Sequence, residues 1–167
     1  MSADPEIAAA AHKALETLRA RAWTVATAES CTGGMIAAAL TDIAGSSDVV
    51  LGGWVTYSNA MKARQLGVEA ATLAAHGAVS EPVATAMAVG ARDRADAEVA
   101  VSVTGVAGPG GGSAEKPVGL VWFGYADEMN VRAHRMRFDG DRAAVRRAAT
   151  LFALTLLSGD GMPTAVV

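Results

Sequence analysis

Residues 23–41 read WTVATAESCTGGMIAAALT and indicate the fold class. The segment Trp23–Ala28 alternates and is rich in β-branched side chains, which is typical of a strand. The polar segment Glu29–Gly34 then breaks that pattern, and Met35–Thr41 predicts a helix. A strand that passes through a short loop into a helix is the building unit of an α/β sheet. We therefore expect the polar loop to lie at the carboxyl end of a sheet strand.

The rest of the chain continues this alternation of helices and strands. Val99–Val103 is a continuous apolar run, typical of a strand covered on both faces, and it ends in the glycine-rich loop Thr104–Ser113. Two further strands, Val118–Tyr125 and Asn130–Phe138, are separated by a short acidic turn and predict an antiparallel hairpin. The other expected elements are helices at 4–21, 59–66, 73–77, 80–93 and 142–157, a turn at 45–48, and a strand at 49–58 in which Gly52-Gly53 marks a bulge or a close backbone approach.

These elements predict a three-layer α/β/α sandwich. Its sheet should be mixed and mostly parallel, with the antiparallel hairpin at one edge. A chain of 167 residues has the length of one domain, and neither a linker nor a repeat divides it. We therefore expect a single domain over residues 1–167.

Composition excludes several classes of protein. Hydrophobic residues make up 51% of the chain and charged residues 19%, which is too apolar for a disordered protein. The 14 Lys and Arg against 17 Asp and Glu give a net charge of −3, which does not favour nucleic-acid binding. No apolar run approaches the ~18 residues that cross a bilayer, and the acidic start is unlike a secretory signal. The sequence thus predicts a cytoplasmic protein without membrane contact.

The sequence offers little for a metal site. Cys31 is the only cysteine, so no disulfide within the chain and no cluster of several cysteines can form. His12, His76 and His134 are dispersed without the spacing of zinc ligands, and each is interpreted as a surface or packing residue. We therefore expect any chemistry of this protein to proceed without a metal.

The two polar loops, Glu29–Gly34 and Thr104–Ser113, follow apolar strands. Because ligands bind at the carboxyl ends of strands in open α/β sheets, both loops should face one cleft. Ser30 lies at the exit of the first strand, where a nucleophile would project into that cleft. The amides around Thr32, Gly33 and Gly34 open a helix and could bind a phosphate or a developing oxyanion. The alternative is that these glycines serve turn geometry alone.

Lys62 is the candidate base for Ser30. Burial in an apolar cleft would lower the pKa of its amine, and the neutral amine could take a proton from a serine hydroxyl. Tyr57, five residues earlier, could hydrogen-bond that amine or relay the proton. The alternative is a solvated helix lysine and a half-buried strand tyrosine.

Cys31 is the rival nucleophile, because a thiolate at a helix N-terminus has a lowered pKa. Packing as a small buried side chain, or a backbone contribution to the site, are its other interpretations.

Arginines are concentrated near the last helix. Arg142 follows the expected helix cap and could hold a phosphate with two hydrogen bonds. Arg146 and Arg147 are expected to pair with solvent or with acidic neighbours.

Five ordered motifs resemble one known family. They are AESCTGG at 28–34, TYSN at 56–59 followed by Lys62, HGAVS at 76–80, TGVAGP at 104–109 and KPVG at 116–119. Together they resemble the C-terminal domain of the competence/damage-inducible CinA proteins, and also the stand-alone PncC-type nicotinamide mononucleotide amidohydrolases. The motifs span nearly the whole chain. The sequence departs from the family at Gly110, where related chains often carry Asp. We expect the chain to correspond to the C-terminal domain alone, without the N-terminal domain of full-length CinA proteins.

The resemblance implies a function and a set of site residues. It implies hydrolysis of the carboxamide of nicotinamide mononucleotide to nicotinic acid mononucleotide and ammonia, in pyridine nucleotide (NAD) recycling, with no cofactor. Ser30 is implied as nucleophile, with Lys62 and Tyr57 as its activating partners. The resemblance further implies that Ser46, Thr104 and Gly105 contact the substrate and that Arg142 binds its phosphate.

A binding module is the competing interpretation. The same cleft could hold a pyridine nucleotide without converting it, as a regulatory domain would. In both cases the expected partner is a small nucleotide rather than a nucleic acid or a membrane. The alanine-rich helices also lead us to expect a homo-oligomer.

Overall fold

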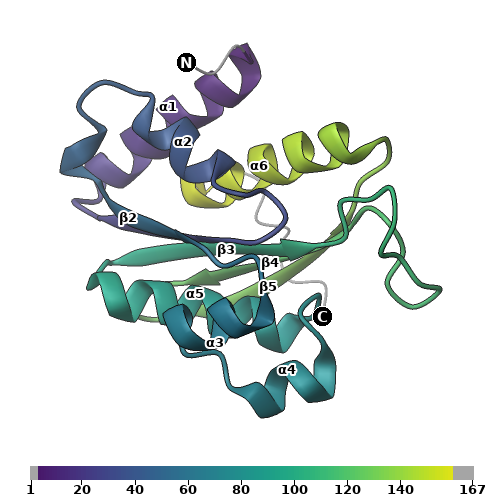
Figure 1. Ribbon diagram of the computed structural model, residues 1–167. Coiled ribbons are helices and arrows are strands. Elements are labelled where there is room, and N and C mark those ends of the chain that lie inside the picture. The colour runs from purple at the N-terminus through teal and green to yellow at the C-terminus, as the bar shows by residue number, and fades with distance from the viewer. Residues whose placement is uncertain (1–3, 160–167) are drawn as a thin grey trace.

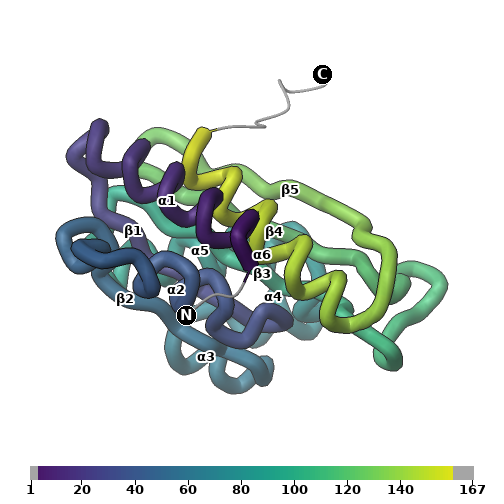
Figure 2. Tube along the Cα trace, turned by 90° about the horizontal axis from the view of Figure 1, so that it is seen from above, coloured from purple at the N-terminus to yellow at the C-terminus, as the bar shows by residue number. Residues whose placement is uncertain are grey.

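The computed structural model describes residues 4–159 and consists of a five-stranded sheet with helices on both faces (Figure 1). Helices α1, α2 and α6 cover one face, and α3, α4 and α5 cover the other. Figure 2 shows α1 and α6 side by side. In chain order the elements are α1 (Pro5–Ala20), β1 (Val25–Glu29), α2 (Met35–Thr41), a 3₁₀ turn (Ser46–Asp48), β2 (Val50–Val55), α3 (Asn59–Leu66), α4 (Ala70–His76), α5 (Glu81–Ala95), β3 (Val99–Gly105), β4 (Leu120–Ala126), β5 (Val131–Arg137) and α6 (Arg142–Ser158).

The sheet has the order β2-β1-β3-β4-β5. Strands β2, β1 and β3 are parallel, whereas β4 and β5 form an antiparallel hairpin at the other edge. The predicted α/β/α sandwich with a mixed sheet is therefore confirmed. Glu29, the last residue of β1, pairs with Val55 of β2 and Val103 of β3. The carboxyl ends of all three parallel strands consequently meet at one edge of the sheet.

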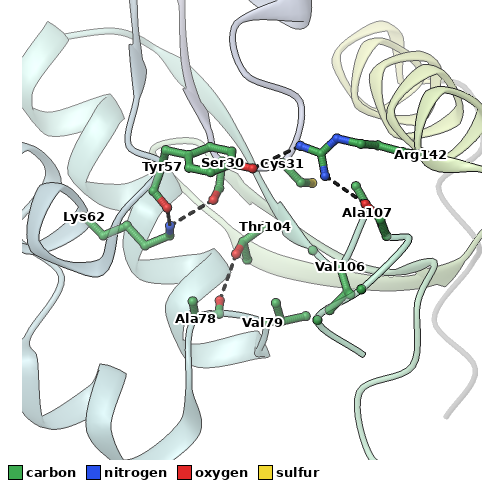
Figure 3. A pocket seen from close by; sticks show the side chains of 14 residues that line it. Ser30, Cys31, Tyr57, Lys62, Ala78, Val79, Thr104, Val106, Ala107 and Arg142 are labelled. Carbon is green, nitrogen blue, oxygen red and sulfur yellow. Dashed lines mark hydrogen bonds between the residues drawn. The ribbon is translucent and has the colours of Figure 1, made fainter. Parts of the chain in front are cut away.

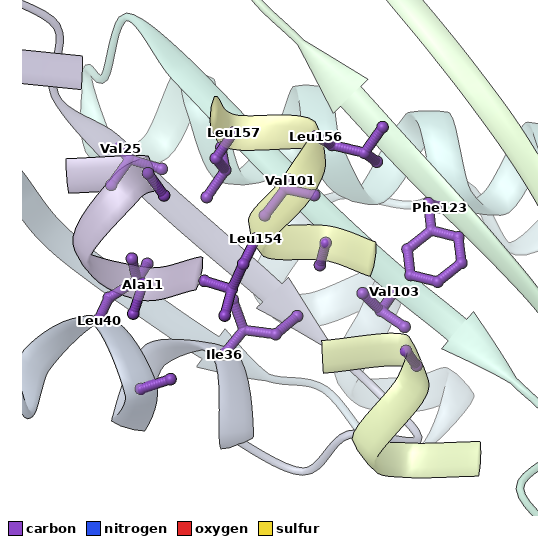
Figure 4. Packing of buried hydrophobic residues seen from close by; sticks show 14 of the residues in the cluster. Ala11, Val25, Ile36, Leu40, Val101, Val103, Phe123, Leu154, Leu156 and Leu157 are labelled. Atoms are coloured by element: carbon purple, nitrogen blue, oxygen red, sulfur yellow. The ribbon is translucent and has the colours of Figure 1, made fainter. Parts of the chain in front are cut away.

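Two hydrophobic clusters pack on opposite faces of the sheet. The larger one joins α1, α2 and α6 to the sheet through residues such as Ala11, Ile36, Val101 and Leu154, which are all fully buried (Figure 4). The smaller one lies under α5 and contains Val83, Met87, Leu66, Ala26 and Ala100. Along β1 and β3 larger side chains face the first cluster and alanines face the second, so α5 can approach the sheet closely.

Local signals explain where most of the elements begin. The Asp4 carboxylate accepts hydrogen bonds from the amides of Glu6 and Ile7, so α1 starts at Pro5. The Ser58 hydroxyl accepts one from the amide of Met61 and starts α3. The strand expected at 49–58 is shorter, because this cap turns the chain out of the sheet after Val55.

The Gly52-Gly53 pair lies both at an irregularity of the β1–β2 pairing and at a close approach between the two strands, the two alternatives predicted for it. The register between β1 and β2 shifts beside it, where Val25 pairs with Val50 and Ala26 with Gly52. A Cβ on Gly53 would also lie 2.3 Å from the hydroxyl oxygen of Thr27.

Among residues 4–159, no helix has the length and hydropathy needed to cross a membrane.

The close packing of α5 on the sheet predicts a difference between two strand glycines. A Cβ on Gly124 would lie 2.2 Å from the carbonyl oxygen of Ala84 in α5, whereas a Cβ on Gly52 meets nothing within 4 Å. We expect Gly124→Ala to lower the free energy of unfolding by about 1–3 kcal/mol through overpacking. The matched control Gly52→Ala should be neutral or slightly stabilising. Urea denaturation measures both, and equal losses would contradict this account of the packing.

Candidate active site

A cavity of about 320 Å³ lies at the carboxyl ends of β1, β2 and β3 (Figure 3). Four segments supply most of its wall: the turn after β1, the segment from β2 into α3, the turn before α5 and the loop after β3. The start of α6 closes it. Its lining residues are Ser30, Cys31, Tyr57, Lys62, Ala78, Val79, Thr104–Gly108, Gly110, Gly111 and Arg142. The two polar loops therefore share one cleft, as the sequence predicts.

Ser30 and Lys62 meet in this cavity. Lys62 lies on α3, where its side chain is only 1% exposed, and its Nζ is 2.9 Å from the Ser30 hydroxyl oxygen. The same Nζ lies 2.8 Å from the carbonyl oxygen of Thr56 and 3.3 Å from that of Tyr57. Among residues 4–159, no carboxylate forms an ion pair with Lys62. The amine is thus surrounded by neutral oxygen atoms.

This environment changes the protonation of Lys62. Burial disfavours the charged ammonium and lowers the pKa of Lys62 from 10.5 to about 8, and the neighbouring Cys31 opposes this only partly. About a tenth of the molecules then carry a neutral amine at pH 7. The site therefore holds a usable base close to neutral pH.

The hydrogen-bond geometry determines what the neutral amine does. A neutral amine has two N–H groups and one lone pair, and a backbone carbonyl can only accept. When the carbonyls of Thr56 and Tyr57 take the two N–H groups, the lone pair is left facing the Ser30 hydroxyl. In that state Lys62 accepts the proton of Ser30, which is the geometry of a nucleophile and its general base.

Cys31 does not have the character of a nucleophile. Its side chain is 5% exposed and packs in the larger hydrophobic cluster. Burial raises the pKa of the Cys31 thiol to about 11, so the thiol stays protonated near neutral pH. This supports the packing interpretation of Cys31.

Two of the amides expected to bind a phosphate or an oxyanion, those of Gly33 and Gly34, donate to groups of the protein itself. The amide of Gly33 donates to the carbonyl of Ser30, and that of Gly34 donates to the carboxylate of Glu29. The Thr32 hydroxyl also donates to Glu29, and none of Thr32, Gly33 and Gly34 lines the cavity. The amides of Gly33 and Gly34 therefore have acceptors within the protein, and a buried carboxylate occupies the N-terminus of α2.

Ser46 is also far from the cavity. It lies in the 3₁₀ turn that precedes β2, close to Val49, whose carbonyl accepts from the amide of Val25 at the start of β1. Because β1 and β2 are parallel, this turn lies at the amino ends of the strands, opposite to Ser30. Ser46 therefore does not line the cavity formed by its own chain.

The other expected binding residues do line the cavity. The Thr104 hydroxyl donates to the carbonyl of Ala78, which joins two walls. Gly105 lies so close to β4 that a Cβ there would be 2.8 Å from the carbonyl oxygen of Leu120. Arg142 donates to the carbonyl of Gly108 and to the phenol of Tyr57, each at 3.0 Å.

Tyr57 contacts Lys62 in a different way from the one expected. Lys62 donates to the backbone carbonyl of Tyr57, whereas the phenol oxygen accepts from Arg142. The side chain of Tyr57 is 61% exposed. The phenol therefore belongs to the mouth of the cavity rather than to the Ser30–Lys62 pair (Figure 3).

Sequence reasoning missed two residues behind the Ser30 turn. Glu29 is 1% exposed and accepts four hydrogen bonds from the start of α2. Arg146 was expected to pair with solvent or acids, but it donates to the carbonyls of Cys31 and Thr32. Arg147 does pair with the acidic Asp4 and Glu6. One signal was available for Arg146: it lies one helical turn after Arg142, on the same face of α6.

The described residues contain no group of three or more His, Cys, Asp and Glu side chains arranged to hold a metal. His134 lies on β5 and packs against Phe152 of α6. Strands β3 and β4 separate β5 from β1 in the sheet. None of the histidines lines the described cavity.

The lowered pKa of Lys62 can be measured directly, because the chain has only three lysines. In NMR spectra of protein with ¹³C-labelled lysine, one Cε signal should titrate with a midpoint of about 8. It should be charged below this pH and neutral above it, since burial disfavours the charged form. The signal should be missing in Lys62→Met. A Lys62 signal that titrates near 10.5 would contradict the geometry described above.

Comparisons with known proteins agree with this architecture. The family model of the CinA C-terminal domain matches residues 7–160. The nicotinamide-nucleotide amidohydrolase PncC of Escherichia coli K12 is 54% identical over 155 residues, which cover 92% of this chain and 94% of that protein. The PncC of Enterobacter agglomerans is 57% identical over 138 residues, which cover 82% and 84%.

Longer proteins and solved structures show the same relationship. The CinA-like protein of Citrifermentans bemidjiense is 54% identical over 140 residues, which cover 84% of this chain but only 34% of that protein. The crystal structure of the competence/damage inducible protein CihA from Agrobacterium tumefaciens has a TM-score of 0.91 and 49% identity, and covers 95% of this chain and 98% of that one. This chain belongs to the CinA C-terminal domain family.

Proposed function

We propose that this chain hydrolyses the carboxamide of nicotinamide mononucleotide to nicotinic acid mononucleotide and ammonia, as an enzyme of pyridine nucleotide recycling. The PncC relatives are named nicotinamide-nucleotide amidohydrolases, and they match this chain over nearly their whole length. The observation that carries the proposal is the buried Lys62 amine, 2.9 Å from the Ser30 hydroxyl and without an acidic partner among the described residues. Such a pair supplies the nucleophile and the base that amide hydrolysis needs.

The first half of the reaction is the acylation of Ser30. Neutral Lys62 takes the hydroxyl proton while the Ser30 oxygen attacks the carboxamide carbon. The positive charge of the pyridinium ring draws electrons from that carbon and makes it more electrophilic. The Lys62 ammonium then gives its proton to the amide nitrogen, the carbon–nitrogen bond breaks, and ammonia leaves an ester on Ser30.

The second half releases the product. A water molecule loses a proton to Lys62 and attacks the ester carbon. The bond to the Ser30 oxygen breaks, and Lys62 returns the proton to that oxygen. The sum is one amide and one water converted to one carboxylic acid and one ammonia, with Ser30 and Lys62 restored.

The cavity mouth supplies the proposed contacts to the rest of the nucleotide. Arg142 is exposed at the mouth and uses only one N–H on Gly108 and one on Tyr57, so further donors remain for a phosphate. Tyr57 holds Arg142 there, and Thr104 and Gly105 form part of the wall. Because Glu29 occupies the start of α2, the phosphate contacts should come from Arg142 and the glycine-rich loop after β3.

The alternative of a binding module is not favoured. A lysine buried among neutral oxygens costs folding free energy, which binding alone does not require. Homo-oligomerisation, the absence of nucleic-acid binding and a cytoplasmic location stay predictions.

Loss of either member of the pair should abolish turnover. We expect Ser30→Ala and Lys62→Met each to lower the rate of ammonia release from nicotinamide mononucleotide by at least about 100-fold, with the fold retained. Cys31→Ala is the control and should keep near-normal turnover. Mass spectrometry checks the product, because replacement of the amide by an acid adds about one dalton. Activity that survives in Ser30→Ala but not in Cys31→Ala would assign the nucleophile to the thiol.

The phosphate contact of Arg142 can be separated from chemistry by a second substrate. Arg142→Met should raise KM for nicotinamide mononucleotide about tenfold or more, because a charged contact is lost. The efficiency kcat/KM for nicotinamide riboside, which lacks the phosphate, should change much less. Equal losses on both substrates would show that Arg142 does not recognise the phosphate.

A further inference from the structure

The turn that carries Ser30 lies between two charged side chains that do not line the catalytic cavity, Glu29 and Arg146. Their role deepens the proposed function and rests on it, because it concerns how the nucleophile is held. Each contacts the backbone between β1 and the first turn of α2, but from a different element: Glu29 from the end of β1 and Arg146 from the second turn of α6.

Glu29 binds the donors of this segment. One carboxylate oxygen accepts from the Thr32 hydroxyl at 2.6 Å and from the amides of Gly34 and Ile36, both at 3.1 Å. The other accepts from the amide of Ala37 at 2.9 Å. These amides belong to the first turn of α2, where a helix has no internal acceptor for them. A carboxylate at this position also interacts favourably with the helix dipole.

Arg146 binds the acceptors of the same segment. Its Nε donates to the carbonyl of Cys31 at 3.0 Å, and its Nη2 donates to the carbonyl of Thr32 at 3.1 Å. The planar guanidinium holds both carbonyls in one fixed geometry, which a single ammonium group cannot reproduce. The peptide groups on the carboxyl side of Ser30 are thereby tied to α6.

These contacts bear directly on the Ser30–Lys62 distance. Lys62 is positioned by α3 and by the end of β2, whereas Ser30 is positioned by β1 and by the turn after it. The turn after β1 sets the position of Ser30 on its carboxyl side, while the Ser30 amide donates to the carbonyl of Val103 in β3. A displacement of the Ser30 hydroxyl by about 1 Å can cost about 100-fold in rate.

We propose that Arg146 and Glu29 are positioning residues that hold the 30–37 segment from two sides, the guanidinium taking its carbonyls and the carboxylate taking its N–H and O–H groups. Neither residue touches the substrate. Neither charge contributes to the lowered pKa of Lys62, which arises from burial against the opposing effect of Cys31. Loss of either residue should therefore displace the nucleophile and leave the base unchanged.

The test compares neighbouring arginines of α6. Arg146→Met should lower kcat by about tenfold or more, with little change in KM and with the midpoint of the pH profile unchanged. Arg147→Met is the matched control, since Arg147 pairs with Asp4 and Glu6 on the surface, and it should keep normal kinetics. Arg146→Lys should recover only part of the rate, because one ammonium cannot satisfy both carbonyls at the same geometry.

Hydrogen exchange provides a readout independent of turnover. The amides of Gly34, Ile36 and Ala37 should exchange faster in Arg146→Met than in Arg147→Met. Glu29→Gln should also speed exchange and lower kcat, because its NH₂ cannot accept hydrogen bonds from the donors that one of the two carboxylate oxygens now binds. If Glu29→Gln does not fold, the comparison of Arg146→Met with Arg147→Met in kcat and in hydrogen exchange decides whether the segment is held in this way.

The outcomes separate this inference from the proposed function. A wild-type protein that releases no ammonia from nicotinamide mononucleotide would refute the function, and exchange in the 30–37 segment would then decide the positioning role. Wild-type turnover together with equal kcat and equal exchange in Arg146→Met and Arg147→Met would overturn the positioning role and leave the function standing.

Discussion

The site depends on a lysine amine that is buried without a counter-charge. An ammonium in such a place loses its hydration and gains no carboxylate in return, so the neutral form becomes accessible near pH 8. Two backbone carbonyls then direct the lone pair of Lys62 toward Ser30. Burial and carbonyl geometry therefore act together, because burial provides a neutral amine and the carbonyls orient it. An acidic partner would have kept the amine charged and removed it as a base.

The parallel sheet brings these groups together through its register. Glu29 pairs with Val55, and the amide of Thr56 donates to the carbonyl of Glu29. The segments that follow β1 and β2 in the chain therefore start side by side, with Ser30 next to Thr56. The Ser58 cap then starts α3, which carries Lys62 back over the strand ends within one helical turn. A pair separated by 32 positions in the chain is assembled in this way by two short connections.

A second constraint concerns the start of α2. A helix N-terminus after a glycine-rich turn usually attracts an anion from solution. Here Glu29 supplies that anion from inside the protein and uses the donors that a ligand would otherwise bind. The helix start contributes to the rigidity of the turn, and ligand contacts are left to the loop after β3 and to Arg142. A glycine-rich strand–turn–helix segment can therefore have a structural role in one protein and bind phosphate in another.

Much of this architecture is already encoded in local patterns. The Asp4-Pro5 cap, the alternation of β1, the apolar run of β3 and the Gly52-Gly53 irregularity each correspond to what is observed, because caps, periodicity and glycine geometry act over a few residues. The strand exits and the scarcity of lysines made Ser30 and Lys62 one candidate pair beside a solvated-lysine alternative, and the resemblance to the CinA family implied the pair. Three-dimensional packing decided the rest. Packing brings Arg146 into hydrogen-bond contact with the carbonyls of Cys31 and Thr32, and Glu29 into contact with the amides at the start of α2. It also places Ser46 at the amino ends of the parallel strands, opposite to Ser30. Hydrogen-bond partners far apart in the chain are selected by distance in space, and no local sequence pattern encodes that distance.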